Sequence, residues 1–223
     1  MNQTQHLRLL VGNHNYSSWS LRAWLCLSHF GLSFETDKVL LSQVDTSQNL
    51  AEKSPSKRVP VLFVDEQPVW DSLAICETVN DLFLQGKAWP EDPMLRATGR
   101  AICSEMHSSF MALRAALPMN IRKQFQSFPL SLEVQSDVQR VLAIWQDQLK
   151  EEREGGFLLG EFSIADCMYA PVVSRFTTYN IEVSEEVKHY MNRVLALPAM
   201  KAWTDLALAE EEIIAIEEYV GGQ

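Results

Sequence analysis

The pattern of apolar residues changes once along this chain, in the stretch from Gln85 to Pro93. Before this stretch, short apolar runs that suit strands alternate with segments of helical periodicity. After it, apolar residues recur every three or four positions and no strand pattern occurs. Glycine and proline within the stretch are typical of a linker. The sequence therefore predicts an α/β domain over residues 1–84, a linker over 85–95 and an all-helical domain over 96–223.

The first domain alternates strands with helices. Four segments carry a strand pattern: 7–11, 34–41, 61–64 and 68–70. One helix is predicted from Ser17 or Ser18 to about Gly31 and another from Asp71 onward, whereas the polar segment 45–57 is predicted to be a loop. A strand–helix–strand order requires parallel pairing with a right-handed crossover, and the last two strands suit an antiparallel hairpin. We expect a βαβ unit followed by a ββα unit.

Charge and hydropathy exclude several kinds of partner. The net charge of −10 argues against nucleic acid, because binding to phosphates needs clustered lysine and arginine. No apolar run approaches the ~20 residues that span a bilayer, and the polar start of the chain lacks a secretory signal. We expect a soluble, cytoplasmic protein with no membrane partner. The acidic residues near the C-terminus are predicted to form a solvated helix face: Glu210, Glu211, Glu212, Glu217 and Glu218.

Cysteine and histidine spacing does not favour a metal site. The four cysteines are Cys26, Cys76, Cys103 and Cys167, and no two form a Cys-x-x-Cys pair. Each lies in an apolar helical context, so all four are predicted to be buried and reduced. The five histidines are scattered and show no His-x-x-x-His spacing. We therefore predict that the protein holds no metal.

The segment Asn15–Arg22 places serine hydroxyls where a strand turns into a helix. A helix start carries unpaired N–H groups and a partial positive charge, which stabilise an anion or a thiol that loses its proton. No histidine–aspartate pair at a recognisable spacing supports a nucleophilic serine. The alternative is that the serines only cap the helix and form the turn. Ser17, Ser18 and Ser20 all remain candidates for the functional hydroxyl, and Tyr16 is a further alternative.

Four motifs, in this order, resemble the glutathione S-transferase superfamily over nearly the whole chain. They are Ser17-Ser18-Trp19-Ser20-Leu21-Arg22, Arg58-Val59-Pro60, Asp71-Ser72 and Phe162-Ser163-Ile164-Ala165-Asp166. The first motif is most similar to the Ser-Ser-Cys-x-x-Arg motif of the zeta class, the maleylacetoacetate isomerases, with Trp19 in place of cysteine. The resemblance implies a serine-type transferase with a thioredoxin-like first domain and a helical capping box at Ser163 and Asp166.

The resemblance also implies a binding site for glutathione as co-substrate. Val59 and Pro60, joined by a cis peptide bond, would present backbone to the cysteinyl part of glutathione. Asp71 and Ser72 would bind its γ-glutamyl end, a role that agrees with the anion affinity of a helix start. The remaining candidates flank the expected position of the glycyl carboxylate: Gln43, Lys57 and Arg58. Surface charge and helix capping are the alternatives for these residues.

By the same resemblance, Ser17 and Ser18 are the catalytic hydroxyl donors to the thiol. A small electrophile would bind between the domains, and the candidates for its binding are Trp19, Arg22, His107, Met111 and Arg175. Arg175 lies where zeta enzymes carry an arginine that attracts an acidic substrate. A structural salt bridge is the alternative for both Arg22 and Arg175.

The resulting expectation is a glutathione-dependent transferase that activates the thiol for addition to a small electrophile. A cis–trans isomerase of the maleylacetoacetate type is the first alternative. A glutathione-binding protein with little activity, or an interaction protein that has lost the site, are further alternatives. The resemblance also implies a homodimer.

Overall fold

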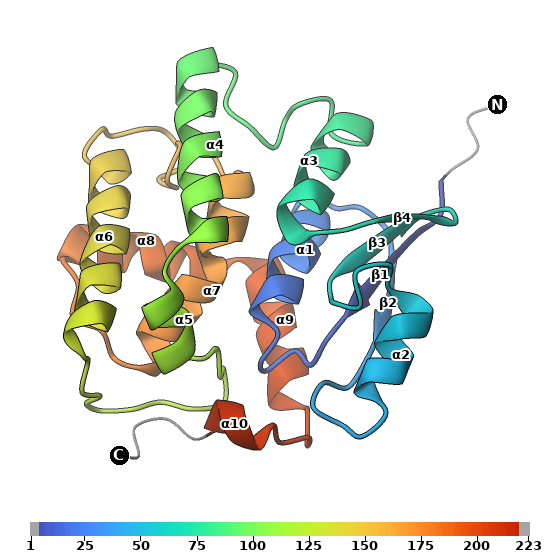
Figure 1. The fold of residues 1–223 in the computed structure, drawn as a ribbon. Helices are drawn as coiled ribbons and strands as arrows, with labels where there is room; N and C mark the ends of the chain where they lie inside the picture. Colours follow the sequence, from blue (N-terminus) through green and yellow to red (C-terminus); the bar gives the residue numbers. More distant parts are fainter. Residues whose placement is uncertain (1–4, 219–223) are drawn as a thin grey trace.

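The computed structural model describes residues 5–218 (Figure 1). Its N-terminal part is a four-stranded sheet with helices, in the predicted order of a βαβ unit followed by a ββα unit. The elements of this part are β1 (Leu7–Val11), α1 (Ser18–His29), β2 (Glu35–Lys38), α2 (Thr46–Lys53), β3 (Val61–Val64), β4 (Gln67–Val69) and α3 (Ser72–Leu82).

The sheet has the strand order β2-β1-β3-β4. Strands β1 and β2 pair in parallel through the α1 crossover, whereas β3 is antiparallel to β1 and forms a hairpin with β4. Both types of pairing confirm the sequence prediction. The central strands β1 and β3 are almost entirely buried, so β3 is a continuous apolar run and β1 is an apolar run interrupted only by Arg8.

The prediction of a loop over 45–57 is wrong, because residues Thr46–Lys53 form α2. Leu50 is the one buried residue of this helix, and it packs in a small cluster with Leu10, Val39 and Val61. A helix that buries a single side chain shows almost no apolar periodicity. Its formation therefore depends on packing against the sheet rather than on a pattern visible in the sequence.

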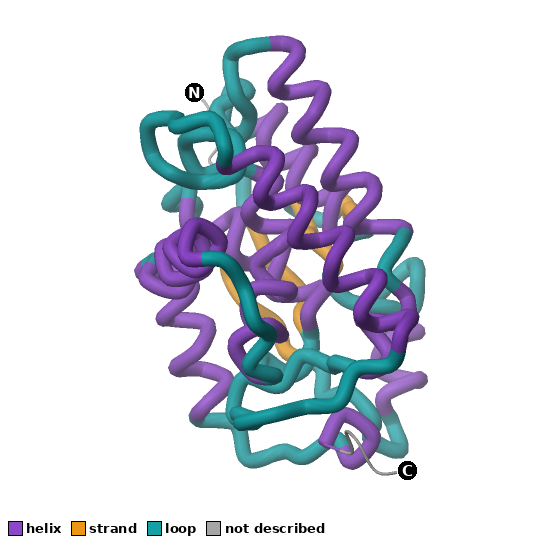
Figure 2. The backbone as a smooth tube through the Cα atoms, turned by 90° about the vertical axis from the view of Figure 1, so that its left-hand side faces the viewer, coloured by secondary structure: helices purple, strands orange, loops and turns teal. Residues whose placement is uncertain are grey.

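The second part of the chain is helical, and seen from the α6 side its helices lie in front of the strands (Figure 2). Its helices are α4 (Pro93–Ser108), α5 (Met111–Ala116), α6 (Leu132–Leu149), α7 (Ile164–Thr178), α8 (Glu185–Ala196), α9 (Pro198–Leu208) and α10 (Ala215–Glu218). Helix α4 begins at Pro93, inside the stretch predicted as a linker.

Helix α7 is the centre of this part, and all but one of its residues are buried. It packs against α1, α4 and α8, so it joins the helical part to the sheet-bearing part. The predicted capping box at its start is present: the Asp166 carboxylate accepts hydrogen bonds from the Ser163 N–H at 2.9 Å, the Ser163 hydroxyl at 3.0 Å and the Leu158 N–H at 3.2 Å. This buried carboxylate fixes the loop before α7 to the first turn of the helix.

All four cysteines are free and buried, as predicted, and burial raises the pKa of the Cys103 thiol well above its ordinary value. Within residues 5–218, no helix is long and apolar enough to cross a membrane. No group of three or more histidine, cysteine or acidic side chains in that same range could hold a metal ion.

The prediction that the C-terminal acidic residues form a solvated face is wrong for Glu210. Its carboxylate is buried and accepts hydrogen bonds from the backbone N–H groups of His14 (2.7 Å) and Asn15 (3.0 Å) and from Lys38 Nζ (3.2 Å). Burial alone would raise its pKa, but these donors and the His14 ring hold the pKa at about 2. The segment after α9 is therefore tied to the loop between β1 and α1.

Candidate active site

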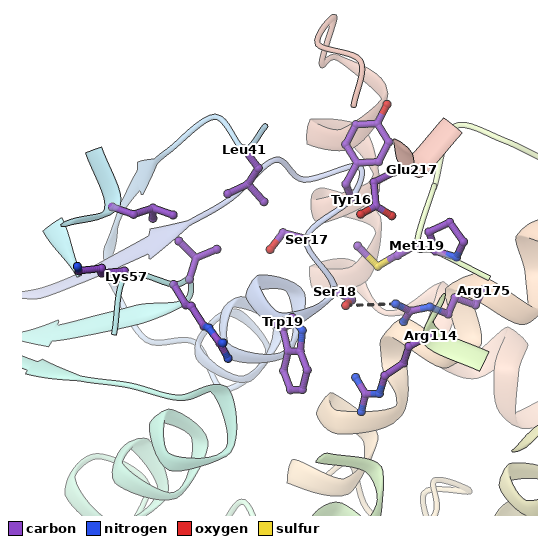
Figure 3. A pocket seen from close by; sticks show the side chains of 14 residues that line it. Tyr16, Ser17, Ser18, Trp19, Leu41, Lys57, Arg114, Met119, Arg175 and Glu217 are labelled. Carbon is purple, nitrogen blue, oxygen red and sulfur yellow. Dashed lines mark hydrogen bonds between the residues drawn. The ribbon is translucent and has the colours of Figure 1, made fainter. Parts of the chain in front are cut away.

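The site begins at the turn between β1 and α1. Ser17 is the N-cap residue of α1 and Ser18 is the first residue of the helix. The Ser17 side chain makes no capping hydrogen bond, so the interpretation of this serine as a simple cap is wrong. Both side chains are largely buried, and both line a cavity at the positive end of the helix (Figure 3).

The serine hydroxyls belong to two separate hydrogen-bond systems. Ser17 Oγ donates to Ser20 Oγ at 2.7 Å, and Ser20 Oγ also accepts from the Gly12 N–H at 3.0 Å. Ser18 Oγ accepts from Arg175 Nη2 at 3.3 Å. Ser20 is fully buried and does not line the cavity, so it cannot touch a ligand there. The structure leaves Ser17 and Ser18 as the hydroxyls that face the cavity.

The cavity beside these serines has a volume of about 380 Å³. Ser17 and Ser18 lie between Tyr16 at one end and Trp19 at the other in Figure 3. Its charged lining residues come from four segments of the chain: Lys57, Arg58, Arg114, Arg175 and Glu217. Arg175 was predicted to bind the electrophile and lines this cavity. Arg114 also lines it, three residues after Met111, which was predicted to bind the electrophile as well.

Two of these cations are not neutralised by an acid. Arg175 donates from Nε to the Leu117 carbonyl at 2.7 Å, and Arg114 donates from Nε to the Ser109 carbonyl at 2.9 Å. Neither guanidinium forms an ion pair with any residue in the described range 5–218. Burial lowers the pKa of Arg175 to about 10, which still leaves it protonated at neutral pH. Among the described residues, four cations and one acid line the cavity, which therefore presents an excess of positive charge beside Ser18.

Trp19 packs against two guanidinium groups. The carbon at the centre of the Arg22 guanidinium is 4.3 Å from a Trp19 ring centroid, and that of Arg114 is 4.7 Å away. The indole covers Arg22, which is fully buried and does not line the cavity. No residue from 5 to 218 accepts a hydrogen bond from this guanidinium, and burial lowers its pKa to about 9. The structure thus supports neither direct substrate contact nor a salt bridge for Arg22.

A second cavity, of about 450 Å³, adjoins the first. It is lined by Val59 and Pro60, whose peptide bond is cis as the resemblance implies, and by Asp71 and Ser72. The Ser72 hydroxyl is buried at the start of α3 and has no hydrogen-bond partner among the described residues. An unpaired buried hydroxyl at a helix N-terminus suits an incoming carboxylate.

Asp71 connects this second cavity to the helical part. One carboxylate oxygen accepts from the backbone N–H groups of Leu73 (3.0 Å) and Ala74 (3.2 Å), which caps α3. The other lies 2.7 Å from His107 Nε2. His107 was predicted to contact the electrophile, but it lines the second cavity with Asp71, and its ring packs edge-to-face with that of Trp19. Its place on α4 gave no sequence signal for this partner.

Besides Arg22, two predicted residues are not brought to either cavity, as the described lining residues show. Gln43 is exposed on the loop before α2, where its N–H donates to Thr46 Oγ1 at 2.8 Å. Met111 is exposed at the first position of the short helix α5. Helical spacing put Met111 near the cleft, but α5 turns Arg114 rather than Met111 toward it.

Tyr16 is not free to act on a thiol. Its hydroxyl donates to Glu218 Oε1 at 2.6 Å and accepts from Arg122 Nη2 at 2.8 Å. Burial, with a further contribution from Glu218, raises the pKa of the phenol. Glu217, which was not predicted as a site residue, lines the first cavity beside Tyr16. In the sequence, Glu217 is visible only as one of the acidic residues near the C-terminus, and the fold decides that it lines the cavity.

A thioredoxin-like βαβ–ββα unit with a cis-proline at its cavity, followed by a helical part, defines a class of glutathione-binding proteins. Comparison with family models agrees: the glutathione S-transferase N-terminal domain matches residues 16–82 and the C-terminal domain matches residues 105–206. The chain belongs to the glutathione S-transferase family.

The names of its relatives refer to more than one activity. A probable maleylacetoacetate isomerase from Caenorhabditis elegans is 27% identical over 75% of this chain and 77% of its own length. Glutathione S-transferase L1 from Arabidopsis thaliana is 25% identical over 82% of this chain and 71% of its own length. A glutathione transferase homologue from Burkholderia, solved with bound glutathione, superimposes with a TM-score of 0.72 at 25% identity, covering 92% of this chain and 99% of that chain.

Proposed function

We propose that this protein is a serine-type, glutathione-dependent transferase that adds the glutathione thiol to a small electrophile. The observation that carries the proposal is the junction of the two cavities. Trp19, Arg58 and Val59 line both, so a single ligand can extend from the orphan Ser72 hydroxyl to the serines at the start of α1. An extended tripeptide with a carboxylate at each end and a thiol in the middle suits this arrangement.

In the proposed complex, the α-carboxylate of glutathione accepts hydrogen bonds from the Ser72 hydroxyl and from the Ser72 backbone N–H at the start of α3. Asp71 accepts from the α-ammonium group, and the Val59 backbone pairs with the cysteinyl unit. Lys57 lines the first cavity and Arg58 lines both cavities, and in the proposed complex they attract the glycyl carboxylate. The remaining space, beside Arg114 and Arg175, holds the electrophile.

The proposed chemistry is stabilisation of the thiolate. A free thiol has a pKa of about 8.5, so donors at the positive end of α1 raise the thiolate fraction at neutral pH. The Ser17 proton points to Ser20, but the 2.7 Å contact can reverse by rotation of the two O–H bonds alone. Ser20 would then donate to Ser17 and Ser17 to sulfur, in a chain that begins at the Gly12 N–H. Ser18, polarised by Arg175, is a second donor.

Isomerisation of a cis double bond is the second candidate function. The thiolate would add to one alkene carbon, the single bond formed would rotate, and elimination of the thiolate would restore the double bond. The excess of positive charge at Arg114 and Arg175, neither of which is in an ion pair, favours this candidate, because the substrates of such a reaction carry a carboxylate that conjugates with the alkene. Conjugation and isomerisation both begin with addition of the same thiolate. In isomerisation the thiolate is then eliminated from the adduct, whereas in conjugation it stays bound to the product.

Calorimetry with glutathione and a panel of electrophiles tests the proposal. We expect glutathione to bind and at least one electrophile to be turned over, with Ser17→Ala lowering kcat/KM by about 100-fold while the Kd for glutathione changes less than threefold. Binding without turnover would indicate a carrier protein, and absence of binding would refute the assignment. The proposal includes a cytoplasmic homodimer, which sedimentation velocity tests for the purified protein.

A further inference from the structure

The segment after α9 is held against the loop between β1 and α1. Glu210 is tied to the backbone of His14 and Asn15, as described above. The Arg122 guanidinium donates to the backbone carbonyl of Glu210 and, at 2.8 Å, to that of Glu212. These contacts hold the segment after α9 beside the loop between β1 and α1, which directly precedes Ser17 and Ser18.

A second set of contacts fixes α10. The Glu218 carboxylate accepts from the Tyr16 hydroxyl at 2.6 Å and from Asn120 Nδ2 at 2.8 Å, and it pairs with Lys123 Nζ at 2.6 Å. With Glu218 held on one side of this short helix, Glu217 lies in the cavity wall between Tyr16 and Met119 (Figure 3).

Glu217 is the only acid among the described residues that line this cavity. It is half-buried, and burial raises the pKa of its carboxyl while the charge of Arg175 opposes that rise. The Glu217 carboxylate and the Arg175 guanidinium each shift the pKa of the other, but the two groups do not form an ion pair. Glu217 therefore remains available to act on whatever binds beside Arg175.

We propose that Glu217 is a specificity-determining residue that restricts the electrophile site to molecules with a single negative charge. The inference rests on the proposed transferase function and names the substrate class of the same site. In the proposed complex Lys57 and Arg58 face glutathione, which leaves two cations, Arg114 and Arg175, and one acid, Glu217, around the electrophile. Positive charge therefore exceeds negative charge by one in that part of the cavity. One carboxylate neutralises this excess, whereas a second carboxylate faces Glu217 in a partly desolvated space where repulsion is weakly screened.

Three S-substituted glutathiones test the proposal because they place different charges in the electrophile site. They are S-benzylglutathione, S-(4-carboxybenzyl)glutathione and S-(3,5-dicarboxybenzyl)glutathione, which carry zero, one and two added carboxylates. We would measure the Kd of each by calorimetry at pH 7.5 with the wild type and Glu217→Gln. Glu211→Gln is the matched control, because it removes the same charge from an exposed position of the same segment.

For the wild type we expect the monocarboxylate to bind most tightly. In Glu217→Gln we expect affinity for the dicarboxylate to rise about tenfold and affinity for the benzyl compound to change less than twofold, with Glu211→Gln like the wild type. An unchanged dicarboxylate-to-benzyl ratio in Glu217→Gln, or an equal change for all three compounds, refutes the role of Glu217 and leaves the transferase proposal intact. Failure of all three to bind the wild type refutes the glutathione site, and the role of Glu217 with it.

Discussion

The buried carboxylate of Glu210 provides a quantitative test of how the C-terminal segment is held. Its pKa falls from an ordinary value of 4.5 to about 2, because the His14 and Asn15 donors outweigh the penalty of burial. Each pKa unit corresponds to about 1.4 kcal/mol, so ionisation of Glu210 contributes about 3 kcal/mol to the free energy of unfolding at pH 7. Glu210→Gln, which imitates the protonated acid, should lose this amount.

The pH dependence gives the prediction its sign. Because the pKa is lower in the folded protein than in the unfolded chain, the contribution is fully present above pH 4.5 and is lost as the pH falls toward 2. The difference between the wild type and Glu210→Gln should therefore shrink from about 3 kcal/mol at pH 7 to about 1.4 kcal/mol at pH 3.

Urea unfolding followed by tryptophan fluorescence at several pH values measures this difference. Glu211→Gln serves as the control, because Glu211 is exposed and carries the same charge next to Glu210. A loss below about 0.5 kcal/mol at pH 7, or a loss that stays constant between pH 7 and pH 3, would contradict the assigned hydrogen bonds, since exposed substitutions usually stay within that range.

Three further predictions concern the site and the core. Ser20→Ala removes a hydroxyl that does not line the cavity, and it should lower kcat/KM about tenfold and shift the thiol pKa in the pH–rate profile upward. An unshifted profile would contradict the proposed hydrogen-bond chain from Ser20 through Ser17 to the sulfur. Ser72→Ala should raise KM for glutathione about tenfold with little change in kcat, and steady-state kinetics that show the reverse would place Ser72 in the chemical step instead. Asp166→Ala should reduce the free energy of unfolding by about 3 kcal/mol, because it leaves buried N–H groups unpaired; urea titration would contradict this with a loss under 1 kcal/mol.

Several features were predictable because they depend on neighbours in the sequence. The strands β1 and β3 follow from their apolar runs, and the start of α7 follows from the spacing of Ser163 and Asp166. Burial of the four cysteines follows from the apolar stretches around them. In each case the sequence signal lies within a few positions of the residue concerned, although the strands and the cysteines also pack against distant segments.

Other features depend on contacts between distant segments. His107 was expected near the electrophile but pairs with Asp71, 36 positions earlier by the difference of the two residue numbers (107 − 71). Arg22 was expected to contact substrate or an acid but is covered by Trp19. Neither arrangement leaves a trace in the residues beside these positions, since packing of α4 and α1 decides which face each side chain takes.

The acidic C-terminal residues show the same division most clearly. The sequence by itself determined that they are charged, and a charged run is usually solvated. The tertiary structure decided that Glu210 is buried against His14 and Asn15 and that Glu217 enters the cavity beside Arg175. The physical reason is that a carboxylate can be buried only where hydrogen-bond donors meet it. For Glu210 the backbone donor at His14 lies 196 positions earlier in the chain, so no local pattern can reveal it.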